Sequence, residues 1–176
     1  ITEVLPRKNS LIRPPVANID KLIIIASAAP PVTDLALIDQ LTALSEYKGI
    51  TPVICVNKAD LEPGGELTAL YSSLGYKTVL TSAVTGLGLN ELAEELSGYI
   101  CVLTGNSGVG KSSILNTLNR SLNARTGDLS EKIGRGKQTT RHIELFPAGK
   151  NGYTADTPGY SAFDSVQMEM TEPDRI

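Results

Sequence analysis

The sequence contains little of what several classes of protein require. One histidine and two cysteines cannot supply the ligands of a zinc site within these 176 residues. Cys55 and Cys101 each lie inside an apolar run of strand length, which predicts two buried, reduced thiols and no disulfide. No window approaches 18 consecutive apolar residues, and no signal-peptide pattern follows Ile1. We therefore expect a cytoplasmic protein without a membrane partner.

An excess of basic charge is also missing. The net charge of −3 argues against a uniformly basic protein that binds nucleic acid. Basic side chains are nevertheless concentrated in one segment, where only Asp128 and Glu131 are acidic. They are Arg120, Arg125, Lys132, Arg135, Lys137 and Arg141. This segment is either a solvated loop or a surface that faces RNA.

What the sequence does contain is an alternation of strand-like and helix-like segments. Short apolar runs predict strands, and leucines at helical spacing predict the helices between them, one of which Asn90 would cap. The alternation predicts an α/β fold with three αβα layers and a mostly parallel sheet. The strands are expected within Lys21–Ala29, Pro52–Val56, Lys77–Thr81, Tyr99–Leu103, Arg141–Phe146 and Tyr153–Ala155, and the helices within Asp34–Tyr47, Glu66–Leu74, Asn90–Ser97 and Ser113–Leu118.

The most informative stretch is Tyr99–Leu118. Its apolar strand is followed by the glycine-rich run Gly105–Ser112 and then by a helical pattern. This is the context of a phosphate-binding loop, in which backbone N–H groups and the helix dipole attract a di- or triphosphate. Lys111 would reach the β- and γ-phosphates, and the Ser112 hydroxyl would bind Mg2+. A flexible glycine turn is the alternative interpretation.

A second motif indicates which base is bound. Asn57-Lys58-Ala59-Asp60 fits N-K-x-D, and an aspartate carboxylate accepts two hydrogen bonds from guanine that adenine cannot offer. Asn57 would brace the loops, and the stem of Lys58 would lie over the base. Thr81-Ser82-Ala83 matches the remaining base loop, whose backbone N–H would meet the 6-oxo group of guanine. Taken alone, N-K-x-D also fits an ordinary turn between a strand and a helix.

Two further motifs predict a response to the γ-phosphate. Asp156-Thr157-Pro158-Gly159 fits D-x-P-G at a strand end, where Asp156 would hold Mg2+ through water. The Gly159 N–H would bond the γ-phosphate only when triphosphate is present, so the segment after it would act as a switch. Thr140 would ligate Mg2+ through its hydroxyl and the γ-phosphate through its backbone, and Thr139 is the alternative by one register.

The predicted site residues thus form three groups. The nucleotide-binding group is Asn57, Lys58, Asp60, Ser82, Ala83, Gly105, Asn106, Ser107, Gly108, Val109, Gly110, Lys111, Ser112 and Ser113. The magnesium ligands are Ser112, Thr140 and Asp156. The residues expected to act in catalysis are Lys111, Gln138, Thr140 and Gly159, with GTP as substrate and GDP as product.

The order of these motifs is unusual. Ordinary GTPases present the phosphate loop first, then the switch threonine, D-x-x-G, N-K-x-D and finally S-A. In this chain N-K-A-D and T-S-A precede the phosphate loop, and D-T-P-G comes last. A circular permutation keeps the sheet and the site while it moves the termini, so we predict a phosphate-loop NTPase domain with circularly permuted GTPase topology.

In these motifs and their order the sequence resembles the circularly permuted, ribosome small-subunit-dependent GTPases of the RsgA/YjeQ type. The resemblance covers nearly the whole chain. It rests on LPRKNSLIRPPVANID, NKAD, TSA, GNSGVGKSS, TGDLS, GRGKQTTRH and DTPGYS, in that order.

The resemblance implies a role and a domain organisation. It implies a monomeric GTPase that acts late in maturation of the small ribosomal subunit, contacts its rRNA, and hydrolyses GTP slowly until the subunit stimulates it. It also implies an oligonucleotide-binding barrel before the GTPase domain and a small zinc domain after it. Residues 1–20, which contain the pair Pro14-Pro15, would be the end of that barrel and a linker, and residues 21–176 the GTPase domain. Zinc is expected only in the absent domain, and we expect the chain to be a fragment.

The residue that orients the attacking water is the open point. Tyr160 follows D-T-P-G, where Ras-like enzymes place a glutamine, and the resembling family is expected to use a histidine before the switch threonines. This chain has Gln138 there, whose amide could orient water without acting as a base. Three readings stay open: a slow, subunit-stimulated GTPase, a GTP-gated RNA- or ribosome-binding module with negligible hydrolysis, and an ATP-using kinase or ATPase.

Overall fold

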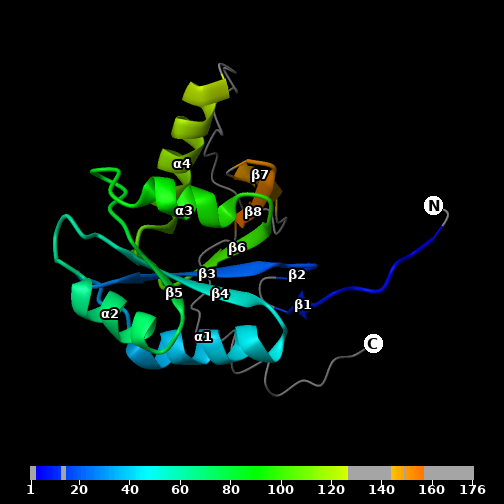
Figure 1. The fold of residues 1–176 in the computed structure, drawn as a ribbon, viewed down its shortest axis with the longest axis horizontal. Coiled ribbons are helices and arrows are strands. Elements are labelled where there is room, and N and C mark those ends of the chain that lie inside the picture. Colours follow the sequence, from blue (N-terminus) through cyan, green and yellow to red (C-terminus); the bar gives the residue numbers. More distant parts are fainter. Residues whose placement is uncertain (1–2, 13–14, 127–143, 149, 157–176) are drawn as a thin grey trace.

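The computed structural model describes residues 3–12, 15–126, 144–148 and 150–156, and within them a six-stranded sheet forms the centre of the fold (Figure 1). The strands run in the order β5-β4-β3-β6-β8-β7. Neighbouring strands are parallel except for β7, which pairs antiparallel with β8 at one edge. Their bounds are β3 Lys21–Ser27, β4 Thr51–Asn57, β5 Lys77–Leu80, β6 Ile100–Thr104, β7 Glu144–Ala148 and β8 Gly152–Asp156.

Two pairs of helices cover the two faces of this sheet, which confirms the predicted three-layer architecture. The helices α1 (Leu35–Tyr47) and α2 (Gly65–Ser73) lie on one face, and α3 (Leu89–Leu96) and α4 (Lys111–Thr126) lie on the other (Figure 1). The central strand β3 shows why both faces need cover. Ile24 joins the core cluster under α1, whereas Ile23 and Ile25 join the cluster under α3 and α4.

The two cysteines lie in this core, as predicted. Both are free and buried. Burial raises the pKa of the Cys55 thiol to about 12 and that of Cys101 to about 12. Because both thiols are neutral near pH 7, they act as small apolar side chains and not as nucleophiles.

The topology places a switch point between β3 and β6. From β3 the chain steps outward through β4 to β5, and it then returns through α3 to β6 on the other side of β3. The loops that follow β3 and β6 therefore leave the sheet in opposite directions. In an open parallel sheet this switch point, at the carboxyl ends of the strands, is where ligands bind.

Two local predictions were wrong. Asn90 does not cap a helix, because α3 begins at Leu89 and its N-cap is Gly88, with a φ of 67°. A Cβ at Gly88 would lie 2.0 Å from the Leu80 carbonyl oxygen, so this tight approach to β5 requires glycine. In α2 the leucine periodicity also overstated the apolar face, because Tyr71 is buried whereas Leu70 and Leu74 are 43% and 62% exposed.

The segment before β3 packs onto the domain. The strands β1 (Ser10–Leu11) and β2 (Val16–Ala17) form an antiparallel pair, and Leu11 and Ile19 belong to the core cluster under α1. The Asn9 side chain donates to the carbonyl of Ile19 and accepts from its N–H, at 2.8 Å each. Among the helices of the described residues, none is both long and apolar enough to cross a membrane.

Candidate functional site

The glycine-rich loop between β6 and α4 lies at the switch point. Gly105, Gly108 and Gly110 have φ values of 139°, 81° and 100°, which other residues rarely adopt. A Cβ on Gly105 would lie 2.2 Å from the Ile25 carbonyl oxygen of β3. The loop therefore depends on glycine both for its backbone conformation and for its close approach to the central strand.

Lys111 is the first residue of α4, and its side chain folds back over this loop. Its ammonium donates to the carbonyl oxygen of Gly105 and to that of Asn106, the latter at 2.7 Å. The cation thus lies beside the loop at the positive end of the α4 dipole. The next two residues, Ser112 and Ser113, are exposed, so their hydroxyls are accessible at this helix N-terminus.

Asn57 joins the phosphate loop to the loop after β5. It ends β4, its side chain is buried, and its Nδ2 donates to the Val109 carbonyl at 2.9 Å. Its Oδ1 accepts from the Ala83 N–H at 3.2 Å and from the Thr81 hydroxyl at 3.3 Å. A Cβ on Gly110 would lie 2.3 Å from Nδ2, so glycine there admits the amide. The side chain of Asn57 therefore bonds to two loops that lie 26 and 52 residues further along the sequence.

Asp60 is positioned by a serine of the other base loop. The hydroxyl of Ser82 donates to Asp60 Oδ1 at 2.6 Å. The same hydroxyl accepts from the N–H groups of Val84 and Thr85, at 3.3 and 3.1 Å. Ser82 is fully buried whereas Asp60 is exposed. Because a carboxylate has about four lone-pair positions, one serine bond leaves Asp60 able to accept both guanine donors.

A loop that the sequence analysis did not single out completes the arrangement. Lys58 has a positive φ of 68°, and its ammonium donates to the Pro30 carbonyl at 2.7 Å. Pro31 lies against the phosphate loop, because a Cβ on Gly108 would be 3.1 Å from Pro31 Cγ. No motif marks this proline-containing loop. Its only signal in the sequence is that it directly follows the apolar run that forms the central strand.

The structure describes some of the remaining predicted site residues and not others. The Ala83 N–H, expected to meet guanine, donates in this structure to Asn57. Asp156 ends β8, whose pairing with β6 brings its backbone to the same edge of the sheet as the phosphate loop, and nothing is described of its side chain. Gln138, Thr139, Thr140 and Gly159 lie outside the described residues, as does most of the basic segment 120–141.

The described part of the site is compatible with Mg2+. No group of three or more histidine, cysteine, aspartate or glutamate side chains that could hold a metal ion occurs among the described residues. Mg2+ does not need such a cluster, because it keeps several waters and binds through one or two protein groups and the phosphates. The exposed hydroxyl of Ser112 beside the loop is a ligand of the right kind. When bound, the ion would neutralise phosphate charge.

Fold and site together define a class of protein. The parallel sheet, the glycine loop with its lysine, and the base loops joined by Asn57 are those of a phosphate-loop GTPase domain. The base loops belong to β4 and β5, which precede the phosphate loop in the chain, so the domain is circularly permuted.

Comparison with known proteins agrees with this class and defines it further. Residues 4–166 match the family model of the RsgA GTPase, and the chain belongs to this family. It is 46% identical over 167 residues to the small ribosomal subunit biogenesis GTPase RsgA of Caldanaerobacter subterraneus, covering 93% of this chain and 57% of that protein. It is 44% identical over 178 residues to the RsgA of Halalkalibacterium halodurans, covering 98% and 60%. The chain thus spans somewhat more than half the length of these relatives.

Solved structures show the same fold. YjeQ from Thermotoga maritima matches with a TM-score of 0.72 and 39% identity, over 90% of this chain and 54% of that chain. YloQ, described as a circularly permuted GTPase, matches with a TM-score of 0.65 and 33% identity, over 90% and 51%. The permuted topology predicted from motif order is therefore confirmed.

Proposed function

We propose that this chain is the nucleotide-binding and nucleotide-hydrolysing unit of a GTPase that acts in maturation of the small ribosomal subunit. One observation carries the proposal. The buried Asn57 amide joins the phosphate loop to the base loop in which Ser82 fixes the Asp60 carboxylate. These hydrogen bonds support the proposal, because recognition of a whole nucleotide requires its phosphate-binding and base-binding groups to be held in fixed relative positions.

The proposed chemistry is positioning and charge neutralisation, which phosphoryl transfer needs more than covalent help. Lys111 and the loop N–H groups would bind the phosphates and stabilise charge that develops on them. Mg2+ would be held by Ser112, Thr140 and Asp156. Gly159 would sense the γ-phosphate, and Gln138 would orient the attacking water. Because an amide cannot take the proton of that water near neutral pH, hydrolysis would be slow in the isolated protein.

The proposed partner is the small ribosomal subunit, including its rRNA. The curated relatives carry small ribosomal subunit biogenesis in their names, and the basic segment 120–141 offers charges suited to phosphate contacts. We further propose a monomeric, cytoplasmic protein in which a barrel precedes residues 21–176 and a zinc domain follows them. The alternative is a GTP-gated ribosome-binding module with negligible hydrolysis, which Gln138 and Tyr160 would favour.

Turnover measured on the full-length parent protein tests the proposal. We expect slow GTP hydrolysis alone and at least a tenfold higher rate with purified small subunits, whereas large subunits serve as the control. Equal rates in both mixtures, with GTP-dependent subunit binding retained, would establish the binding module. No GTP-dependent binding to small subunits would end the ribosomal assignment altogether.

A further inference from the structure

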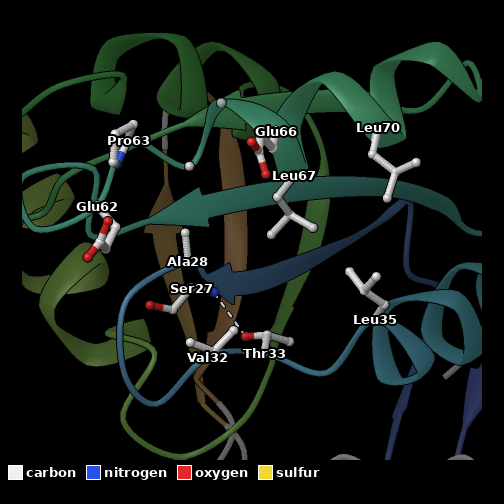
Figure 2. Close-up of a pocket in the computed structure, with 12 residues that line it drawn as sticks. Ser27, Ala28, Val32, Thr33, Leu35, Glu62, Pro63, Glu66, Leu67 and Leu70 are labelled. Carbon is white, nitrogen blue, oxygen red and sulfur yellow. Dashed lines mark hydrogen bonds between the residues drawn. The ribbon is translucent and has the colours of Figure 1, made fainter.

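A pocket, called the hollow below, is lined in part by the loop after β3, whose prolines contact Lys58 and the glycine-rich loop. It has a volume of about 680 Å³ and is formed by the start of α1, the start of α2 and the loop after β3. Figure 2 shows apolar side chains of α1, α2 and this loop around the hollow. Its volume falls in the range of sites that bind small molecules or peptide side chains.

Several of the side chains that line the hollow are apolar and accessible. Val32, Leu35 and Leu70 are 63%, 46% and 43% exposed, and Leu67 lines the same space. Single exposed leucines are ordinary, but several that gather around one hollow mark an interaction surface. Covering them would remove apolar area from water, which favours a partner with apolar side chains of its own.

The charged side chains that line the hollow in the described part of the chain are acidic. Among the residues that the structure describes, Glu62 and Glu66 line it and no lysine or arginine does (Figure 2). Glu66 stands in the first turn of α2, where its carboxylate offsets the positive end of the helix dipole. Two carboxylates disfavour the phosphates of RNA and favour a cation.

The hollow shares a wall with the nucleotide site. Val32 and Thr33 line it, and in the same loop Pro30 accepts the Lys58 hydrogen bond while Pro31 meets the glycine loop at Gly108. The Thr33 hydroxyl in turn accepts from the Ser27 N–H of β3 at 2.9 Å (Figure 2). An occupant that moves or stiffens this loop therefore acts on Lys58 and on the phosphate loop together.

We propose that the hollow between α1 and α2 binds a protein segment in which lysine or arginine stands beside apolar side chains. The apolar groups fill the space between Leu35 and Leu70, and the cation pairs with Glu62 and Glu66. Occupancy holds the loop that contacts Lys58 and Gly108, so the partner tunes nucleotide affinity. The identity of the partner as a protein of the small ribosomal subunit rests on the proposed function.

Site-directed photo-crosslinking on the full-length parent protein tests this proposal. p-Benzoylphenylalanine replaces Leu70 in one variant and Leu74 in a control; Leu74 is exposed at the C-cap of α2 and is not among the described residues that line the hollow. Each variant is bound to purified small subunits with a non-hydrolysable GTP analogue, sedimented and irradiated. We expect position 70 alone to crosslink to a protein, in a peptide that contains lysine or arginine beside apolar residues.

The other outcomes overturn the proposal in distinguishable ways. Sedimentation without a crosslink at position 70, a crosslink to rRNA, or a crosslink within the same polypeptide would each refute the protein partner while leaving the proposed function intact. Failure of the unmodified protein to sediment with small subunits would refute both the protein partner at the hollow and the proposed ribosomal function.

Charge reversal gives a second readout. We expect the pair Glu62→Lys and Glu66→Lys to weaken subunit binding at least tenfold, and Glu94→Lys, on an exposed position of α3, to leave it unchanged. Subunits should also shift the GDP affinity of the parent protein at least threefold and that of the charge-reversed variant not at all. Equal subunit affinity in all three proteins would refute the electrostatic part of the proposal.

Discussion

The two ends of the parallel sheet are held together in different ways. At the carboxyl end, a buried amide and a serine hydroxyl join loops that are remote in sequence, and glycines with positive φ let those loops approach closely. At the amino end, Asp20 and Ile100 bond to each other through backbone N–H, carbonyl and carboxylate groups. The carboxyl end gives the candidate site its shape, and we expect the contacts at the amino end to contribute stability without affecting nucleotide binding.

The contacts at the amino end centre on the carboxylate of Asp20. Asp20 N–H donates to the Ile100 carbonyl at 2.8 Å, and Ile100 N–H donates to Asp20 Oδ2 at 2.9 Å. Lys8 pairs with the other carboxylate oxygen at 2.8 Å. The Ile100 hydrogen bond, helped by Lys8, lowers the pKa of Asp20 below its ordinary value of 3.8. If the two ends of the sheet differ in this way, substitutions at the carboxyl end should weaken nucleotide binding, whereas substitutions at the amino end should lower stability alone.

The largest effect is expected for Asp60→Asn at the carboxyl end. One guanine donor then faces an amide N–H2 in place of an acceptor. Since a hydrogen bond to a charged group contributes ~1.5–3 kcal/mol, GTP affinity should fall by roughly 10- to 150-fold. Xanthosine triphosphate, whose 2-oxo group accepts from that N–H2, should gain affinity. Calorimetric titration with both nucleotides checks this, with Glu94→Gln as control, and an unchanged preference for guanine would remove Asp60 from base recognition.

A smaller effect on binding, combined with lost stability, is expected for Asn57→Ala. The Val109 carbonyl and the Ala83 N–H lose their partner inside a buried site. We expect ~1–3 kcal/mol less stability and a roughly 10- to 100-fold weaker GDP affinity. Urea unfolding and titration measure the two quantities, with Asn90→Ala on the exposed side of α3 as control. Full GDP affinity in a destabilised variant would show that the hydrogen bonds of Asn57 contribute to stability and not to nucleotide binding.

Asp20→Asn should affect stability without affecting the nucleotide. The amide can still accept from Ile100, so we expect a loss of about 1 kcal/mol from the missing charge. Because the pKa of Asp20 is lowered in the folded state, its contribution is present above about pH 4 and is lost as the pH falls through the folded pKa. The difference in stability between the variant and the unsubstituted chain should therefore be constant between about pH 5 and 7 and shrink below about pH 4. A changed GDP affinity would contradict the separation of the two ends.

The smallest effect is expected for Glu91→Gln, on the exposed ion pair between β5 and α3. Lys77 and Glu91 lie 2.7 Å apart, but their side chains are 43% and 49% exposed. Such pairs contribute about 0–1 kcal/mol, and salt screens them further. In thermal unfolding at low and high salt, the melting temperature should change by less than about 2 °C. A larger shift would mean that this ion pair contributes more stability than its exposure suggests.

The sequence predicted the parts of the site that are local and periodic. The apolar run of β3, the glycine loop and the N-K-x-D motif each depend on residues close in sequence, and motif order was enough to predict the permutation. The contacts that unite the site could not be predicted in the same way. Asn57 meets Val109 across 52 residues, and Lys58 meets Pro30 in a loop without any motif.

The errors have physical causes as well. Asn90 is a good capping residue, but the tight approach of residue 88 to the Leu80 carbonyl selected glycine as the N-cap instead. The leucines of α2 have helical spacing, yet this short helix buries only Tyr71, which bonds Asp39 of α1 at 2.7 Å. The exposed side chain of Leu70 lines the hollow between α1 and α2.

The central claim is that the joined loops recognise a guanine nucleotide, and competition for the site tests it most directly. The chain is loaded with a fluorescent GDP derivative in the presence of Mg2+, and unlabelled nucleotides are added. We predict displacement by GTP and GDP at near-stoichiometric concentrations, and no displacement by ATP at a hundredfold higher concentration. Equal displacement by ATP and GTP would contradict the assignment of Asp60 and the GTPase account built on it.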